Sequence, residues 1–336
     1  MEKRATVREV AAATGMSIAT VSRVLNGQAN VATHTRDRVL QALRELGSNA
    51  PQPRATHPSP GSVYVRCPYL LTDYFGLVVT SIAETLALHD LEVVLDSGVS
   101  SQSAPALSRL AGRPGTSGAI LVLPPEPAEA LDVLRAAEVP LVVVDPRVEL
   151  PRDVVSVSAA HFAGARKLMA HVVGLGHRRV GVLGGPREWL ASDGRLAGYA
   201  AALADVGVLG APELVRHVPE PTEEWGRRAA GELLDLGERP TALVAFNDKM
   251  AVGALKAARE RGLDVPGDVS VAGFDDLDLS RATTPGLTTV RQPLQEMGRM
   301  AVTLLVRLLR RHELEATHVE LATDLMVRGS TGPARG

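Results

Sequence analysis

An alternation of short apolar runs with amphipathic segments begins at residue 63 and constrains the fold of this chain more than any other feature. The apolar runs are rich in valine, leucine and isoleucine, as strands covered on both faces are. Strands that alternate with helices of about ten to fifteen residues form parallel sheets with right-handed crossovers. The predicted strands are Val63–Arg66, Glu92–Asp96, Ala119–Leu123, Leu141–Val144, Val154–Val157, Arg179–Leu183, Leu243–Phe246 and Val269–Phe274.

Amphipathic helices are expected between these strands. The stretch from residue 63 to the C-terminus is too long for one comfortable sheet, so we predict an α/β core of two lobes. Each lobe is a doubly wound parallel sheet, and the two lobes face a cleft. The predicted helices include Leu77–Leu88, Ala163–Leu175, Arg195–Ala204, Trp225–Leu236 and Lys249–Arg261.

The first 48 residues have a helical pattern instead. Thr6 and Glu9 have the spacing of a capping box, in which a hydroxyl and a carboxylate each bind a free amide at a helix start. Gly15 ends this helix, and Ser17 caps a second one whose apolar residues recur at steps of three and four. A third helix is expected from about Thr35 to Leu46. Residues 1–48 are therefore predicted to form an all-α headpiece.

Residues 49–62 differ in composition from the parts on either side. Residues 50–61 contain four prolines and no branched apolar residue. Proline fixes φ and removes an amide donor, so this stretch is predicted to be a semi-extended linker. It joins the headpiece to a core of residues 63–336.

Charge is distributed unevenly along the chain. Residues 1–60 carry eight lysines and arginines against four acidic residues, whereas the whole chain carries 36 against 38. A basic headpiece on an acidic core favours a polyanionic partner for the headpiece. A surplus of this size is also common on solvated surfaces, so charge alone leaves both interpretations open.

Composition and motifs exclude several classes of protein. No apolar run approaches the ~18 residues of a membrane-spanning helix, and Arg8 and Glu9 interrupt the N-terminus before a signal-peptide core could form. The single cysteine, Cys67, allows no intrachain disulfide and no four-cysteine zinc site. No catalytic constellation, phosphate loop or dinucleotide fingerprint is evident. We therefore expect a cytoplasmic protein without membrane contact that is not an enzyme and binds no metal or cofactor.

The first two predicted helices fit a helix-turn-helix. Ala11 is small where the two helices cross, Gly15 lies in the turn, and Val21 packs the second helix onto the first. This arrangement leaves the N-terminal turn of the helix from residue 17 to residue 25 free to enter a DNA major groove. A three-helix protein-interaction module has the same apolar spacing and is the alternative.

The geometry of a helix-turn-helix assigns roles to the exposed side chains. Ile18, Ala19 and Arg23 are expected to point at base edges, where Arg23 could bind a guanine bidentately and Ile18 could contact a thymine methyl. Hydroxyls, amides and helix N-termini are expected to hold phosphates. The predicted phosphate contacts are Thr6, Ser17, Thr20, Asn26 and Asn30.

Motifs along almost the whole chain carry a resemblance. In the headpiece they are Val10-Ala11, the run from Gly15 to Gly27, Thr35-Arg36 and Val39. In the core they are Leu175–Val180, Gly194–Tyr199, Phe246–Ala251, Val271–Asp276, Pro285–Val290 and Val327–Thr331. In this order and spacing they resemble the lactose/galactose repressor family of bacterial transcription regulators.

The resemblance implies a fold and a function. Members of the family are dimers that read a palindromic operator on double-stranded DNA, and a small effector in the cleft of a periplasmic-binding-protein-like core alters operator affinity. A bacterial repressor controlled by a carbohydrate-like effector is expected, with an activator as the less frequent possibility. The N-lobe is expected to comprise about 63–160 and 291–318, and the C-lobe about 161–288 and 319–336.

The linker departs from the family pattern. Family members usually have a short hinge helix whose leucine wedges into the minor groove at the operator centre. Here no leucine occurs between Leu46 and Leu70, and Pro53, Pro58 and Pro60 would break a hinge helix. We hypothesise that the headpieces dock with little central kinking of the DNA.

Aromatic residues mark the expected effector cleft. In an open parallel sheet, ligands bind beyond the carboxyl ends of the strands. Only ten aromatic residues occur, none of them in the headpiece. Tyr74, Phe75, Trp189, Phe246 and Phe274 follow or end predicted strands, where their rings could stack on the apolar faces of sugars; filling the core is the alternative role.

Charged side chains complete this expected site. Asp248 and Asp275 each follow a strand and could accept hydrogen bonds from vicinal hydroxyls, while Arg195 could donate several. Capping of the next helix is the alternative for Asp248. The resemblance places effector contacts at these three positions and puts Asp73 at the pocket border. It also reveals a departure, because Ala160-His161 stands where the family commonly has Asp-Asn.

Two other classes of function were compared with the regulator. A solute-binding protein of a sugar transporter would fit the core, but the attached helix-turn-helix argues against it. An enzyme on a two-lobed scaffold lacks a catalytic constellation in the sequence. Fold alone could not separate the three, so the headpiece decides for a DNA-binding regulator.

Overall fold

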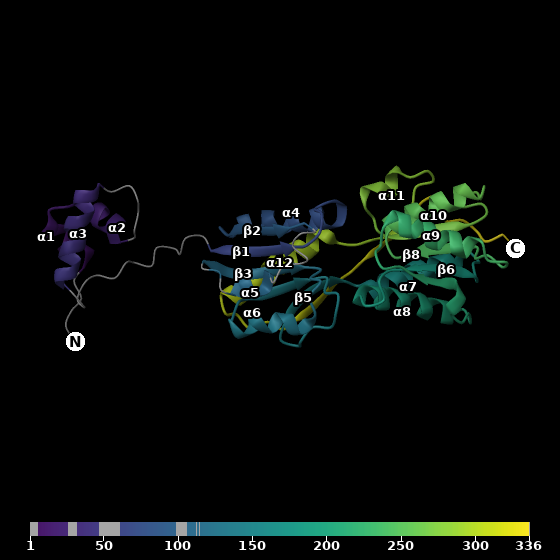
Figure 1. Ribbon diagram of the computed structural model, residues 1–336, viewed down its shortest axis with the longest axis horizontal. Coiled ribbons are helices and arrows are strands. Elements are labelled where there is room, and N and C mark those ends of the chain that lie inside the picture. The colour runs from purple at the N-terminus through teal and green to yellow at the C-terminus, as the bar shows by residue number, and fades with distance from the viewer. Residues whose placement is uncertain are drawn as a thin grey trace. The chain divides into compact units, whose positions relative to one another are not determined.

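The computed structural model describes residues 6–25, 32–46, 61–98, 106–111, 113 and 115–335. The chain divides into two compact units, Met1–Pro60 and Gly61–Gly336. They correspond to the headpiece and the core, and each is described by itself (Figure 1).

Three helices form the headpiece: α1 (Val7–Thr14), α2 (Ile18–Leu25) and α3 (Thr33–Leu46). The capping box predicted at the start of α1 is confirmed, with both of its hydrogen bonds present. Gly15 follows α1 with φ of 66°, a left-handed conformation that glycine adopts without a steric penalty. The small core between the helices consists of Val10, Ala11, Val21, Val24 and Val39.

The N-lobe contains a parallel sheet of six strands in the order β11-β5-β4-β3-β1-β2. Two helices, α4 and α12, cover one face, and α5 and α6 cover the other. The strands are β1 (Ser62–Cys67), β2 (Glu92–Ser97), β3 (Thr116–Val122), β4 (Leu141–Val144), β5 (Val155–Ala159) and β11 (His318–Leu321). The helices are α4 (Asp73–Ala87), α5 (Ala106–Ala111), α6 (Asp132–Ala136) and α12 (Leu294–Leu309).

The C-lobe repeats this plan with the strand order β12-β10-β9-β8-β6-β7, in which only β12 is antiparallel to its neighbour. Its strands are β6 (Val180–Gly184), β7 (Val215–His217), β8 (Ala242–Ala245), β9 (Ser270–Asp275), β10 (Thr288–Arg291) and β12 (Asp324–Met326). Its helices are α7 (His161–Gly174), α8 (Leu190–Ala204), α9 (Glu223–Leu234), α10 (Asp248–Glu260) and α11 (Asp278–Ala282).

Helices pack on both faces of the second sheet as well. Helices α7 and α8 cover one face, and α9 and α10 cover the other. The α9–α10 contact is very close, because a Cβ on Gly253 would lie 2.1 Å from the backbone oxygen of Glu223. A residue larger than glycine would force these two helices apart.

The chain crosses between the lobes three times (Figure 1). The crossings follow β5, β10 and β11, so α12 returns to the N-lobe and β12 completes the sheet of the C-lobe. Strand β11 pairs with β5 as far as Leu321, so the last crossing lies after that residue rather than at residue 318 as expected.

The predicted fold class is confirmed, since an all-α headpiece and two α/β lobes are present. Each predicted strand coincides with an observed one. Four strands of three or four residues were not predicted from the sequence: β7, β10, β11 and β12. Such strands are too short to show a periodic pattern, and pairing with neighbours defines them. In the described part of the chain, no helix is long and apolar enough to span a bilayer.

Candidate DNA-binding surface and effector site

The first turn of α2 is open to solvent. The side chain of Ile18 is 49% exposed, and Ala19 beside it is exposed as well. Ser17 caps this turn, because its Oγ accepts a hydrogen bond from the backbone amide of Thr20 at 3.0 Å. On the opposite face of the helix, Val21 is fully buried in the core of the headpiece. A base edge could therefore reach this turn without any rearrangement of the headpiece.

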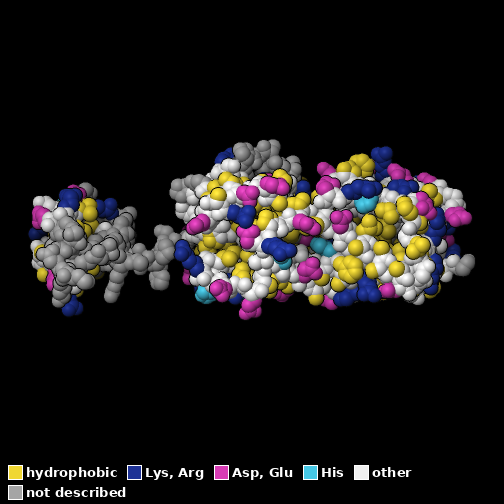
Figure 2. Space-filling model, turned by 90° about the horizontal axis from the view of Figure 1, so that it is seen from below, with side chains coloured by type: hydrophobic (Ala, Val, Ile, Leu, Met, Phe, Trp, Pro, Cys, Tyr) yellow, Lys and Arg dark blue, Asp and Glu magenta, His cyan; other side chains and the backbone are white. Residues whose placement is uncertain are grey.

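The other residues predicted to contact DNA lie in different situations. Thr6 is exposed, and its hydroxyl already takes part in the capping box with Glu9. Arg23 lies in α2, but its side chain is outside the described residues. Asn26 and Asn30 also lie outside the described residues. On the face of the core drawn in Figure 2, acidic and basic side chains are interspersed rather than gathered into one basic stretch.

A chain of polar contacts joins the two lobes at the carboxyl end of β4. Asp145 follows this strand with φ of 53° and accepts a hydrogen bond from the Tyr74 hydroxyl at 2.7 Å. Its other oxygen is 2.8 Å from Nε2 of His161, the first residue of α7. Burial would raise the pKa of Asp145, but the contact with His161 and the hydrogen bonds hold it below its ordinary value. Asp145 is therefore an ionised acceptor between the lobes.

Arg195 extends this chain into the C-lobe. Its side chain is 4% exposed, and one Nη lies 3.4 Å from Nδ1 of His161. The guanidinium carbon is 4.2 Å from the ring centre of Phe246 and 3.8 Å from that of Phe274. The other Nη donates to the backbone oxygen of Phe246, whereas the buried Nε has no protein partner. Arg195 is thus clamped between two rings with one donor unused.

Asp275 ends β9 beside this arginine. Its backbone has φ of 124°, a strained conformation of the kind that concentrates at functional sites. Its carboxylate accepts a hydrogen bond from Nε2 of Gln292 at 2.6 Å, and Oε1 of the same glutamine is buried without a partner. Burial raises the pKa of Asp275 to about 7, although the charge of Arg195 lowers it.

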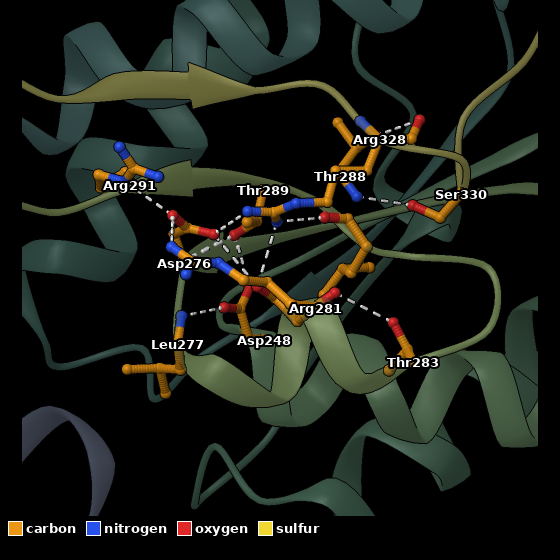
Figure 3. Close-up of polar contacts among 12 residues, drawn as sticks. Asp248, Asp276, Leu277, Arg281, Thr283, Thr288, Thr289, Arg291, Arg328 and Ser330 are labelled. Carbon is orange, nitrogen blue, oxygen red and sulfur yellow. Dashed lines mark hydrogen bonds and ion pairs between the residues drawn. The ribbon is translucent and has the colours of Figure 1, made fainter.

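Asp248 faces protein groups on all sides (Figure 3). It is 0% exposed, and its Oδ1 accepts a hydrogen bond from the Thr289 hydroxyl at 2.5 Å. Its Oδ2 accepts one from the backbone amide of Leu277 at 2.9 Å. Gly273 in β9 makes room for this carboxyl group, because a Cβ there would lie 2.4 Å from Oδ1. An effector contact by Asp248 stays an untested prediction, and this arrangement favours a structural role.

The neighbouring Asp276, which follows β9, is surrounded by a cluster of three arginines from α11, β10 and the segment after β12 (Figure 3). Its buried carboxylate pairs with Arg291 at 2.7 Å, with Arg281 at 3.5 Å and with Arg328. Burial alone would raise the pKa of Asp276, but the hydrogen bonds from Arg328 and Arg291 keep it below its ordinary value. The cluster fixes the loop that carries Asp275.

The aromatic residues predicted for the cleft form two groups. Trp189 lies edge-on to Phe246, with 6.0 Å between the ring centres. On the N-lobe side, Phe75 stacks on Tyr69 at 4.3 Å and also contacts Tyr74. These rings could present apolar surface to a bound ring from both lobes.

Asp73, predicted to border the pocket, forms an ion pair in this structure. It begins α4 and forms an ion pair of 2.9 Å with Lys249 of α10. This pair connects the two lobes directly. Both side chains are partly exposed, so the pair contributes at most about 1 kcal/mol.

Asp145 was not among the predicted site residues, although its position directly after β4 resembles that of Asp275 at the end of β9. Gln292 was not predicted either, and it carries no such signal because it lies in the segment between β10 and α12. Within the described residues no group of three or more His, Cys, Asp or Glu is arranged to hold a metal ion.

Comparison with known proteins identifies both units. Residues 6–48 match the bacterial regulatory proteins of the lacI family, and residues 169–331 match the periplasmic binding protein-like domain. The chain is 36% identical to the HTH-type transcriptional regulator MalR of Streptomyces coelicolor, over 98% of this chain and 97% of that protein.

Solved structures agree with this assignment. A complex of the transcriptional regulator CelR with cellobiose superposes with a TM-score of 0.74 at 30% identity, over 97% of this chain and all (100%) of that one. The Lac repressor dimer bound to operator and the anti-inducer ONPF superposes with a TM-score of 0.74 at 28% identity, over 98% and 100% of the two chains. With its helix-turn-helix headpiece and its two-lobed core, this chain belongs to the lacI family of bacterial regulatory proteins.

Proposed function

We propose that the protein is a repressor that binds a palindromic operator as a homodimer. Its affinity for the operator falls or rises when a carbohydrate-like effector binds between the lobes. Repression takes place in the cytoplasm, where the operator lies. The observation that carries the effector site is the chain of contacts from Tyr74 through Asp145 and His161 to Arg195, because it joins both lobes and leaves the buried Nε of Arg195 without a partner. The oxygen of a sugar hydroxyl could accept from this donor.

The proposed assignment of residues follows from this geometry. Ile18, Ala19 and Arg23 read bases, while Thr6, Ser17, Thr20, Asn26 and Asn30 hold phosphates. In the core Arg195 and Asp275 bind hydroxyls, and Phe75, Trp189 and Phe246 supply ring surfaces. Residues 49–62 act as the linker and leave the operator centre without a strong kink.

Exposed leucines support the proposed homodimer. Leu77 on α4 is 41% exposed, and Leu70 just before this helix is 66% exposed. Apolar side chains grouped on one side of a lobe are typical of a surface that pairs with a second subunit. Sedimentation velocity of the full chain tests this point, and a monomer at micromolar concentration would contradict it.

The experiment that tests the regulator is selection of operators from random duplexes, followed by binding measurements by fluorescence anisotropy. We expect a two-fold symmetric site, and we expect log affinity to fall linearly with log salt because phosphate contacts release counterions. A screen of mono- and disaccharides by thermal shift, repeated with operator DNA, then tests the effector. Retention of no duplex in preference to another would refute the proposal. A strong central bend in the bound operator would refute only the role of the linker.

A further inference from the structure

A second arginine lies between the lobes, and the function proposed above does not use it. Arg147 follows β4 by a few residues, and its backbone oxygen accepts a hydrogen bond from the amide of Leu190 in the C-lobe at 2.8 Å. Its guanidinium carbon lies 5.3 Å from the ring centre of Tyr69 in the N-lobe and 4.6 Å from that of Trp189 in the C-lobe. Arg147 therefore contacts aromatic rings of both lobes.

The charge of Arg147 has no carboxylate partner among the described residues. One Nη donates to the Tyr69 hydroxyl, and Nε is buried without a hydrogen-bond partner. Partial burial lowers the pKa of Arg147 to about 10, although the charge of Glu188 raises it. A half-buried guanidinium with an unused donor gains free energy from any oxygen acceptor that reaches it.

Arg147 and Arg195 stand at the two ends of one aromatic surface. Arg195 covers Phe246, Phe246 contacts the edge of Trp189, and Trp189 contacts Arg147. Two aromatic rings thus separate the two guanidinium groups. A single sugar ring bound at Arg195 and Asp145 would leave the donor of Arg147 unused, whereas a second ring could accept from Arg147 and lie against Trp189.

We propose that Arg147 is a specificity-determining residue that selects effectors with a second sugar ring over monosaccharides. The inner contacts at Asp145, His161 and Arg195 bind the first ring, and Arg147 with Trp189 binds the second. The proposal rests on the carbohydrate effector proposed above. Binding of the second ring disrupts the partly exposed contact between the Arg147 guanidinium and the Trp189 indole, but the charge-assisted hydrogen bonds to that ring contribute more free energy. Removal of Arg147 therefore weakens the binding of two-ring ligands.

The test compares ligands that differ by one ring. Binding of glucose, cellobiose and maltose to the full chain is measured by calorimetry for the native sequence, Arg147→Ala and Arg147→Lys. Arg228→Ala is the matched control, because its guanidinium lies 5.4 Å from the ring centre of the only other tryptophan, Trp225, on the surface of the C-lobe. Urea unfolding of every variant shows that each one is folded.

We expect the native protein to bind one of the disaccharides at least about tenfold more tightly than glucose, a gap of about 1.4 kcal/mol. Arg147→Ala should remove that preference and change glucose affinity less than about twofold, with Arg147→Lys in between because it keeps the charge but loses the planar fork. Arg228→Ala should change neither. The proposal would be overturned if Arg147→Ala kept the native ratio of disaccharide to glucose affinity, lost the same factor of affinity for both ligands, or bound the disaccharide more tightly.

A further ligand distinguishes a second ring from an anion. Glucose 6-phosphate carries acceptor oxygens and charge but no second ring. If it binds more tightly than both disaccharides in an Arg147-dependent manner, the residue selects a charged group and the two-ring proposal is wrong. If the native protein binds no sugar while it still binds its operator, the carbohydrate effector itself is wrong, and that result differs from an unchanged disaccharide preference.

Discussion

Substitution of Asp248 separates a structural role from a ligand contact. Asp248→Ala would remove both acceptors and leave the Leu277 amide and the Thr289 hydroxyl buried without their partner. Each of these two unpaired buried groups costs about 1–3 kcal/mol, so we expect the free energy of unfolding to fall by about 2–6 kcal/mol. Helix α11, which Leu277 directly precedes, should lose its hydrogen bond to α10.

Asp248→Asn is the matched control. Burial and the nearby Asp275 raise the pKa of Asp248 well above its ordinary value. Asparagine has the shape of this side chain without its charge. Its amide oxygen can accept from the Leu277 amide, and its NH₂ group can donate to the Thr289 oxygen once that hydroxyl has rotated. We expect a loss of less than about 1 kcal/mol for Asp248→Asn.

Urea unfolding of the full chain, followed by circular dichroism, measures both variants. The change in midpoint is converted to free energy with the slope of the native protein, provided that the slope is unchanged. If Asp248→Ala unfolded at the native urea concentration but no longer bound the effector, the carboxyl group would serve the ligand and the structural interpretation would fail.

Three further predictions follow from particular residues. Arg23→Ala should abolish discrimination between operator and random duplex, at a cost of about 1–3 kcal/mol per half-site, while effector binding persists; anisotropy titrations check this. Gly253→Ala should destabilise the core by at least about 1–3 kcal/mol, because its Cβ would meet the Glu223 oxygen; an unchanged urea midpoint would contradict it. The folded-state pKa of Asp275 is about 7 against 3.8 ordinarily, so the folded state binds more protons between these values. The free energy of unfolding should therefore fall with rising pH across this window, by at most about 1.4 kcal/mol per pH unit relative to Asp275→Asn. Melting curves of both proteins at several pH values measure this difference. If the stability of both proteins depended on pH in the same way, the assignment would be wrong.

Much of the fold could be predicted from the sequence because it is encoded locally. The capping box at Thr6, the turn at Gly15 and the buried face of Val21 are set by residues a few positions apart. The strands of both sheets are runs of β-branched residues whose burial follows from their composition. The missed strands, such as β7 and β12, contain only three residues and depend on a neighbour for their definition.

The candidate site was predicted only in part. Phe246 and Asp275 lie together, as their positions at strand ends indicated, and Arg195 of α8 lies beside them. Asp73 pairs with Lys249 across the lobes, and its place at the pocket border stays a prediction. Asp145 was missed, although it follows a strand in the same way.

The sequence by itself determined the helices of the headpiece, the alternation of strands and helices, and the family. Only the tertiary structure decided the surroundings of each carboxylate. Asp248 begins α10 shortly after β8, and Asp275 ends the adjacent strand β9. Asp248 is nevertheless enclosed by Thr289 and Leu277, while Asp275 lies in the electrostatic field of Arg195. The physical reason is that the direction and protonation of a buried side chain depend on partners from distant segments, and those partners meet it only when the lobes have formed.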